Sequence, residues 1–92
     1  MKKIFRFVSE RIPLQWKNLA RELPILPDDL IEAEIFQIEE MHRGNLKEQA
    51  YRSLIVWETS EPEQCTKEML ITALKDCRLN LVVKELSTQP WI

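Results

Sequence analysis

The residues able to carry out acid–base, nucleophilic or metal chemistry are few in this sequence and are not grouped. His42 is the only histidine, and it precedes the single glycine in a turn-forming run, where it is expected on the surface. The two cysteines, Cys65 and Cys77, form neither a C-x-x-C pair nor a cysteine–histidine pattern with metal-ligand spacing. No glycine-rich phosphate loop and no catalytic serine motif is present. The sequence therefore predicts a protein that is not an enzyme and that holds no cofactor and no metal.

Charged side chains, in contrast, are strongly organised along the chain. Residues 1–21 carry a net charge of +5, residues 22–40 carry −7, residues 41–57 carry +2 and the remainder carries −2. The simplest interpretation is that these charges only solvate exposed surfaces. The alternative is that one basic and one acidic surface meet head-to-tail between related domains, because complementary potentials orient such an encounter. A head-to-tail contact need not close, so it can build a higher-order helical assembly.

Length and composition limit the class of protein further. A chain of 92 residues with 45% apolar content can bury one core, and we expect a single domain over 1–92, with a core at about 3–88 and a tail at 89–92. The net charge of −2 and the pI of about 5.4 argue against binding to nucleic acid. No apolar run approaches the roughly 18 residues of a membrane span, so no membrane insertion is expected. Two cysteines are too few for a disulfide scaffold, which favours reduced thiols in a cytoplasmic protein.

The elements that must position these charges are predicted to be helices. The most regular segment is 45–59, in which an apolar stripe of Leu46, Ala50, Leu54 and Trp57 recurs at helical spacing. Asn45 can cap this helix, with Glu48 in the capping-box position. Five further helices are expected at residues 3–11, 14–23, 28–41, 67–77 and 80–87. No strand-like alternation competes, so the fold class is all-α.

The side of the central helix opposite its stripe also carries apolar residues. Ile55 falls nearly opposite the stripe and Val56 on its flank, beside the cation of Arg52. One interpretation is that a neighbouring loop covers these two residues. The other is that they form an exposed apolar contact for a partner, and this second interpretation makes Arg52 and Ile55 candidate partner-binding residues.

Taken together, these segments resemble the death-domain superfamily. Residues 16–23, WKNLAREL, resemble its second-helix motif of a tryptophan followed by L-A-R-x-L, and residues 35–39 fit its I-x-x-I-E. Residues 45–57 match its N-L-x-E-x-x-x-x-S-L-x-x-W pattern, and residues 66–79 match T-x-x-x-L-x-x-A-L-x-x-C-x-L. Residues 80–82 most resemble the last helix of adaptor members; a death domain of a RIP-like or other signalling protein is the alternative. A small helix-turn-helix nucleic-acid-binding domain is a further alternative, which the acidic segment disfavours.

The resemblance implies a six-helix antiparallel Greek-key bundle, the death-domain fold, without catalysis. It implies homotypic binding to the death domain of a receptor or upstream adaptor, in apoptotic or innate immune signalling of the NF-κB type. In adaptors of this kind an initiator caspase is recruited through a separate domain, which is absent from this chain.

Candidate binding residues follow from the resemblance and from charge. Lys17 and Arg21 fall on the basic positions of the family's second helix. The acidic positions carry over less directly, because the connection after this helix is several residues longer than the family pattern. Asp28, Asp29 and Glu32 are therefore candidates by their charge alone.

Overall fold

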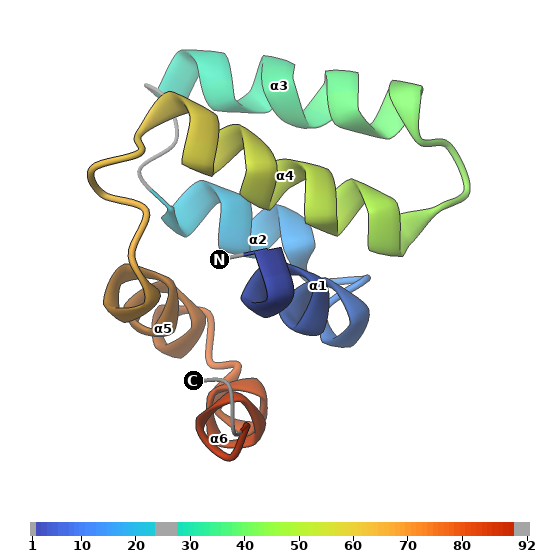
Figure 1. The fold of residues 1–92 in the computed structure, drawn as a ribbon. Helices are drawn as coiled ribbons and strands as arrows, with labels where there is room; N and C mark the ends of the chain where they lie inside the picture. The colour runs from blue at the N-terminus through green and yellow to red at the C-terminus, as the bar shows by residue number, and fades with distance from the viewer. Residues whose placement is uncertain (1, 24–27, 90–92) are drawn as a thin grey trace.

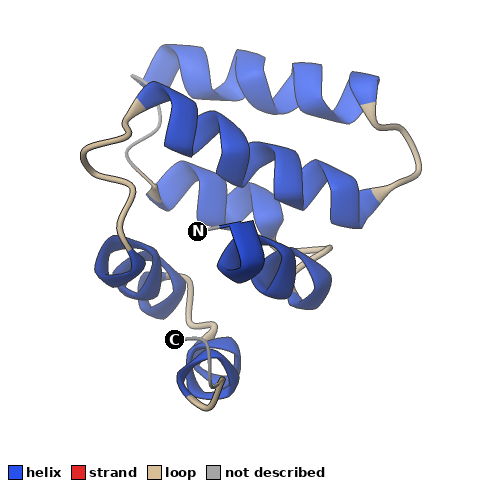
Figure 2. Cartoon of the chain, viewed as in Figure 1, coloured by secondary structure: helices blue, strands red, loops and turns tan. Residues whose placement is uncertain are grey.

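Helices make up most of the part of the chain that the structure describes. This computed structural model describes residues 2–23 and 28–89, without the side chains of residues 28–30. The helices are α1 (Lys2–Arg11), α2 (Trp16–Glu22), α3 (Asp28–Met41), α4 (Leu46–Ser60), α5 (Lys67–Asp76) and α6 (Asn80–Ser87). No strand occurs within 2–23 or 28–89, as Figure 2 shows. The predicted all-α class with six helices is confirmed, and every helix boundary lies within two residues of its predicted position.

Helix α4 lies at the centre of the bundle. It packs against α1, α2 and α3, and Figure 1 shows α3 running beside it in the opposite direction. Helix α5 packs on α2, and α6 packs on both α5 and α1. The predicted role of residues 45–59 as the central helix is confirmed. Among the described residues, no helix is long and apolar enough to cross a membrane.

The starts of α4 and α5 show why these helices begin where they do. The side chain of Asn45 accepts a hydrogen bond from the backbone N–H of Glu48 at 3.1 Å, and Thr66 accepts one from Met69 at 3.1 Å. The predicted cap is thus confirmed, but the reciprocal half of the capping box is not formed. The N–H of Asn45 donates instead to the carbonyl of His42 at 3.0 Å. Gly44 adopts a φ of 75°, a left-handed conformation that glycine adopts without a steric penalty.

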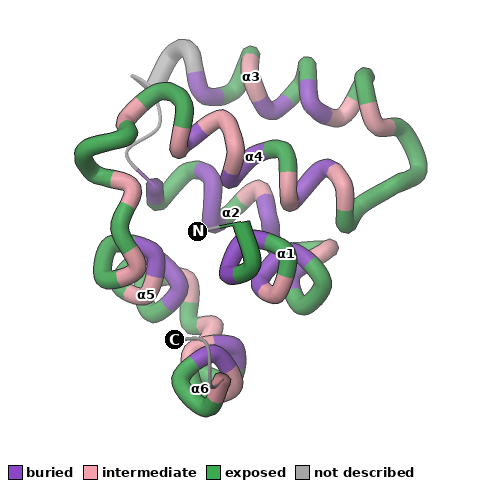
Figure 3. The backbone as a smooth tube through the Cα atoms, in the orientation of Figure 1, coloured by how far each residue is buried: buried purple, intermediate pink, exposed green. Residues whose placement is uncertain are grey.

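The core is built around two fully buried tryptophans, Trp16 and Trp57. The ring of Trp57 packs on that of Phe5 with centroids 6.2 Å apart, which joins α4 to α1. Other side chains that are fully buried include Val8, Ile12, Leu19, Leu54, Leu70, Leu74 and Leu86. Figure 3 shows the buried positions on the sides of the helices that face each other.

One member of the predicted α4 stripe, Leu46, is not buried. It is 41% exposed, although its angle around the helix is correct. Leu46 is the first residue of α4, and the core begins one turn later, at Gln49 and Ala50. The stripe prediction was wrong here because periodicity gives the direction of a side chain but not where the neighbouring helices end.

A buried polar side chain, Gln49, occupies the first core level of α4. Its Oε1 accepts a hydrogen bond from the indole Nε1 of Trp16 at 3.2 Å, and its Nε2 donates to the carbonyl oxygen of His42 at 2.9 Å. Gln49 is only 4% exposed, so both ends of its amide are satisfied inside the protein. These bonds fix α2 against α4 and against the turn that precedes α4.

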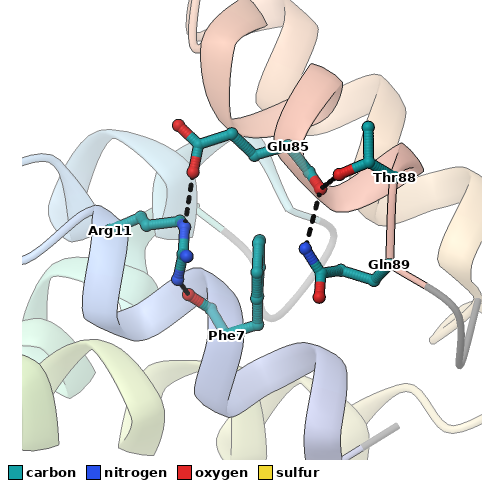
Figure 4. Close-up of polar contacts among 5 residues, drawn as sticks. All are labelled: Phe7, Arg11, Glu85, Thr88 and Gln89. Atoms are coloured by element: carbon teal, nitrogen blue, oxygen red, sulfur yellow. Dashed lines mark hydrogen bonds and ion pairs between the residues drawn. The ribbon is translucent and has the colours of Figure 1, made fainter.

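The first and last helices are in contact, since α1 packs on α6 (Figure 4). The Nε of Arg11 lies 2.7 Å from a carboxylate oxygen of Glu85, and its Nη1 donates to the carbonyl of Phe7 at 3.2 Å. The guanidinium also lies over the Phe7 ring, 3.6 Å from its centroid. Arg11 therefore binds its own helix and α6 at the same time.

The corner between α5 and α6 contains a left-handed residue that is not glycine. Arg78 has a φ of 60°. Its N–H donates to the carbonyl of Lys75, and the N–H of Leu79 donates to that of Leu74, both at 2.9 Å. This pair of bonds is the Schellman arrangement, in which the left-handed position is usually glycine.

Removal of the Trp57 side chain is expected to destabilise the protein severely. Trp57→Ala should lower the free energy of unfolding by about 3–5 kcal/mol, because it leaves a large cavity in the centre of the core. The indole N–H of Trp57 has no partner among the described residues, so Trp57→Phe loses no hydrogen bond and should cost clearly less. Urea unfolding of both variants measures the difference. A loss below about 1 kcal/mol for Trp57→Ala would mean that α4 is placed wrongly.

Replacement of Arg78 by glycine is expected to stabilise the protein. Arg78→Gly should raise the free energy of unfolding by up to about 1 kcal/mol, because glycine adopts a positive φ without steric cost. Arg78→Ala removes the same side chain but keeps the Cβ, so it should bring no such gain. Thermal unfolding of the two variants, followed by circular dichroism, separates the backbone effect from loss of the side chain. Equal melting temperatures for Arg78→Gly and Arg78→Ala would show that the positive φ of Arg78 does not lower stability.

Candidate functional site

Two rows of opposite charge face each other where α2 packs on α3. Arg21 makes a two-pronged ion pair with Glu32, in which Nε lies 2.6 Å from Oε1 and Nη2 lies 3.2 Å from Oε2. Lys17 lies one turn earlier on α2, and its Nζ is 2.7 Å from a carboxylate oxygen of Glu39. All four side chains remain at least 38% exposed. The structure therefore brings Lys17, Arg21 and Glu32 together in one solvent-accessible surface, the α2–α3 edge, and adds Glu39 to it.

The ion pair at this edge changes the titration of both groups. The hydrogen bond from Arg21 holds the pKa of the Glu32 carboxyl below its usual range, and the same bond raises the pKa of Arg21. Folding lowers the pKa of Glu32, so the ion pair stabilises the folded protein at pH values above the pKa that Glu32 has in the unfolded chain. This stabilisation is lost as the pH falls through the lower pKa that Glu32 has in the folded protein. Exposed pairs contribute little to stability, so the importance of these pairs lies in where they hold charge.

A separate groove lies between α3 and the second half of α4. It has a volume of about 280 Å³ and is lined by Glu34, Arg52, Ile55, Val56, Thr59 and Ser60. Ile55 and Val56 are half-buried and pack against the core, so they are neither fully covered nor fully exposed. Helix α3, rather than a loop, stands beside them, since it supplies Glu34 to the lining. Neither Arg52 nor Glu34 has an ion-pair partner within the described part of the chain.

A second hollow, of about 270 Å³, lies between α2 and α5 on the other side of Arg21. Its lining mixes both signs of charge with one thiol: Asn18, Arg21, Glu22, Asp76, Cys77 and Arg78. Partial burial raises the pKa of the Cys77 thiol, and burial raises that of Cys65 as well. Both cysteines are free thiols. A raised pKa lowers the thiolate fraction, which disfavours reactivity at either position.

Five of the seven predicted binding residues are thus divided between two places. Lys17, Arg21 and Glu32 lie on the α2–α3 edge, whereas Arg52 and Ile55 lie in the α3–α4 groove. The two aspartates, Asp28 and Asp29, begin α3, but their side chains lie outside the described part, as does the end of the expected tail at 90–92.

Three surface residues of α3, Glu34, Phe36 and Glu39, were not among the predicted binding residues. Phe36 is 64% exposed, whereas Ile31, Ile35 and Ile38 form the buried side of α3. The helical spacing of these three isoleucines, which leaves Phe36 on another side, was the available signal. The pairing of Lys17 with Glu39 had no such signal, because it depends on how two helices pack.

The arrangement displays side chains that suit binding to a partner. Charged and apolar side chains are displayed on rigid helices, and within residues 2–23 and 28–89 no group of three or more His, Cys, Asp or Glu residues could hold a metal ion.

Comparison with known proteins gives the family. The sequence model of the death domain matches residues 1–89, and the chain belongs to the death-domain family. This confirms the resemblance and the predicted fold, a six-helix Greek-key bundle. Death domains are non-enzymatic interaction domains that bind other death domains.

Three relatives are similar to this chain, and each is named FAS-associated death domain protein. The mouse protein (Mus musculus) is 38% identical over 78 residues, which are 85% of this chain and 36% of that relative. The human protein (Homo sapiens) is 32% identical over 78 residues, 85% of this chain and 35% of the relative. The bovine protein (Bos taurus) is 34% identical over 82 residues, which are 89% of this chain and 37% of the relative. The chain thus spans about a third of the length of these relatives.

The Arg21–Glu32 pair can be tested in solution. Arg21→Met should return the pKa of the Glu32 carboxyl towards its ordinary value, because the hydrogen bond that lowers it is gone. A pH titration of the side-chain carboxyl by NMR measures this shift. Arg43→Met is the matched control, since Arg43 pairs with Glu40 at 2.6 Å and not with Glu32. An unchanged Glu32 titration in Arg21→Met would show that the pair does not persist in solution.

Proposed function

We propose that this chain is a non-enzymatic adaptor domain that binds the death domain of a receptor or upstream adaptor. We further propose that residues 1–92 form one death domain in a cytoplasmic protein, with partner contacts at Lys17, Arg21, Asp28, Asp29, Glu32, Arg52 and Ile55. The observation that carries the proposal is the exposed basic row of α2, held in place by acids of α3. Charge displayed on rigid helices suits orientation and specificity in homotypic binding.

The names of the relatives support a particular signalling role. They are called FAS-associated, which makes FAS the first partner to test. We propose an output in apoptotic or innate immune signalling, with an initiator caspase recruited through a domain outside this chain.

The internal ion pairs define what a partner must do. Arg21 and Lys17 already bind Glu32 and Glu39, so an incoming acidic side chain must replace or share these contacts. The exposed pairs are weak enough for such an exchange, since ion pairs on a protein surface contribute little to stability. Binding is therefore expected to weaken as salt rises, because the cations contribute through long-range attraction.

Charge reversal at Arg21 tests the proposal. In a pull-down with immobilised FAS and a panel of candidate death domains, Arg21→Glu should abolish binding, because it places an acid where the partner's acid must dock. Its helicity and melting temperature should remain nearly unchanged, since Arg21 is exposed. Lys84→Glu, an equal charge reversal at an exposed position of α6, is the matched control and should bind normally.

The outcomes separate a surface role from a structural one. If Arg21→Glu lost its fold together with binding, Arg21 would not be a contact residue. If both variants bound like the wild type, the α2–α3 edge would not be the binding surface.

A further inference from the structure

The α2–α3 edge contains an exposed aromatic ring between its two ion pairs. Phe36 lies four residues after Glu32 and three before Glu39, and at about 100° per residue these three share one flank of α3. The ring is 64% exposed, while each acid is tied to a cation of α2. Figure 3 shows exposed positions recurring along the outer turns of α3.

This setting distinguishes Phe36 from the other exposed apolar residues. Single apolar residues on a surface are common and need no partner. Leu81, for example, is 69% exposed on α6. One ion-paired acid, Glu85, lies a turn after it, and among the described residues no ion pair lies a turn before it. An aromatic centre with a charged rim on both sides is instead the typical anatomy of an interface anchor.

The α3–α4 groove offers the complementary shape. Its floor includes the half-buried apolar residues Ile55 and Val56, and its volume is about 280 Å³. An apolar cavity of about 150 Å³ is enough to hold benzene, so an aromatic side chain fits this space. Its rim carries one cation, Arg52, and one acid, Glu34, neither of which is paired within the described chain.

The charges around the ring match those around the groove. Along α3 the ring lies between the two acids Glu32 and Glu39, which are paired with the cations Arg21 and Lys17 of α2. An acid such as Glu32 can meet Arg52 of a second molecule, and Lys17 or Arg21 can meet its Glu34. Each side of such a contact between two molecules thus carries both positive and negative side chains.

We propose that Phe36 of one copy of this chain inserts into the α3–α4 groove of a second copy. This proposal rests on the homotypic binding proposed above and names the residues by which the chain binds itself. Phe36 and Glu34 are two positions apart and so point about 160° away from each other around α3. Ring and groove of one molecule therefore face opposite ways. Each contact is head-to-tail and leaves one ring and one groove free, so copies can add without limit.

Mixing two defective variants tests this geometry. Phe36→Asp removes the ring and leaves the groove, whereas Ile55→Lys blocks the groove and leaves the ring. Sedimentation velocity over a concentration series should show wild-type mass increasing beyond a dimer, and each variant alone should associate at least about tenfold more weakly. An equimolar mixture of the two variants should form 1:1 dimers and nothing larger, because only one intact ring–groove contact can form. Leu81→Asp is the matched control and should assemble like the wild type.

The fold of each variant is checked by circular dichroism and melting temperature. If Ile55→Lys unfolds, Arg52→Glu at the exposed groove rim replaces it.

A wild type that remains monomeric at millimolar concentration, a Phe36→Asp chain that assembles normally, or a mixture that stays monomeric would each overturn the proposal. A chain that captures FAS in an Arg21-dependent manner but never self-associates would refute this inference alone. Self-association through ring and groove without capture of any tested death domain would refute the proposed partner instead.

Discussion

The side-chain amide of Gln49 determines how α2 sits in the bundle. It accepts from the indole of Trp16 on α2 and donates to the carbonyl of His42 before α4, deep in the interior. Leaving either group unpaired in such a place costs about 1–3 kcal/mol, so alternative placements of α2 are disfavoured. Because α2 carries Lys17 and Arg21, this buried bond also sets the distance of these cations from the acids of α3. A polar bond inside the core thereby fixes a charged surface outside it.

The surface itself has the opposite energetic character. Its ion pairs are exposed and contribute little to folding, so a partner can compete for them without unfolding the domain. The core that supports them consists of apolar residues and two tryptophans that are fully buried. Stability and the proposed recognition therefore rest on different residues, and surface charge can change while the bundle is retained.

The helices could be predicted from the sequence because their signals are local. Asn45 and Thr66 cap the backbone three residues ahead, and Trp57 follows a helical spacing that is read directly from the chain. The failures depend on tertiary structure. The exposure of Leu46 depends on where neighbouring helices end, and the burial of Gln49 depends on an indole that lies 33 positions away in sequence. The candidate site was also only partly predictable. A motif suggested Lys17 and Arg21, but their pairing with Glu39 and Glu32 depends on how α2 packs on α3.

The contact between Arg11 and Glu85 has a consequence for how the chain folds during its synthesis. These residues are 74 positions apart, and at about 5–20 residues per second the ribosome makes Glu85 roughly 4–15 s after Arg11. Throughout that interval the face of α1 that packs on α6 has no partner, whereas α2, α3 and α4 are all made before α6 and can pack together with α1 first. Loop closure over this distance also slows folding, because entropy must be lost before the contact forms. The nascent domain therefore exposes part of its first helix until its last helix has emerged, and it is during this period that a chaperone would find an apolar surface to bind.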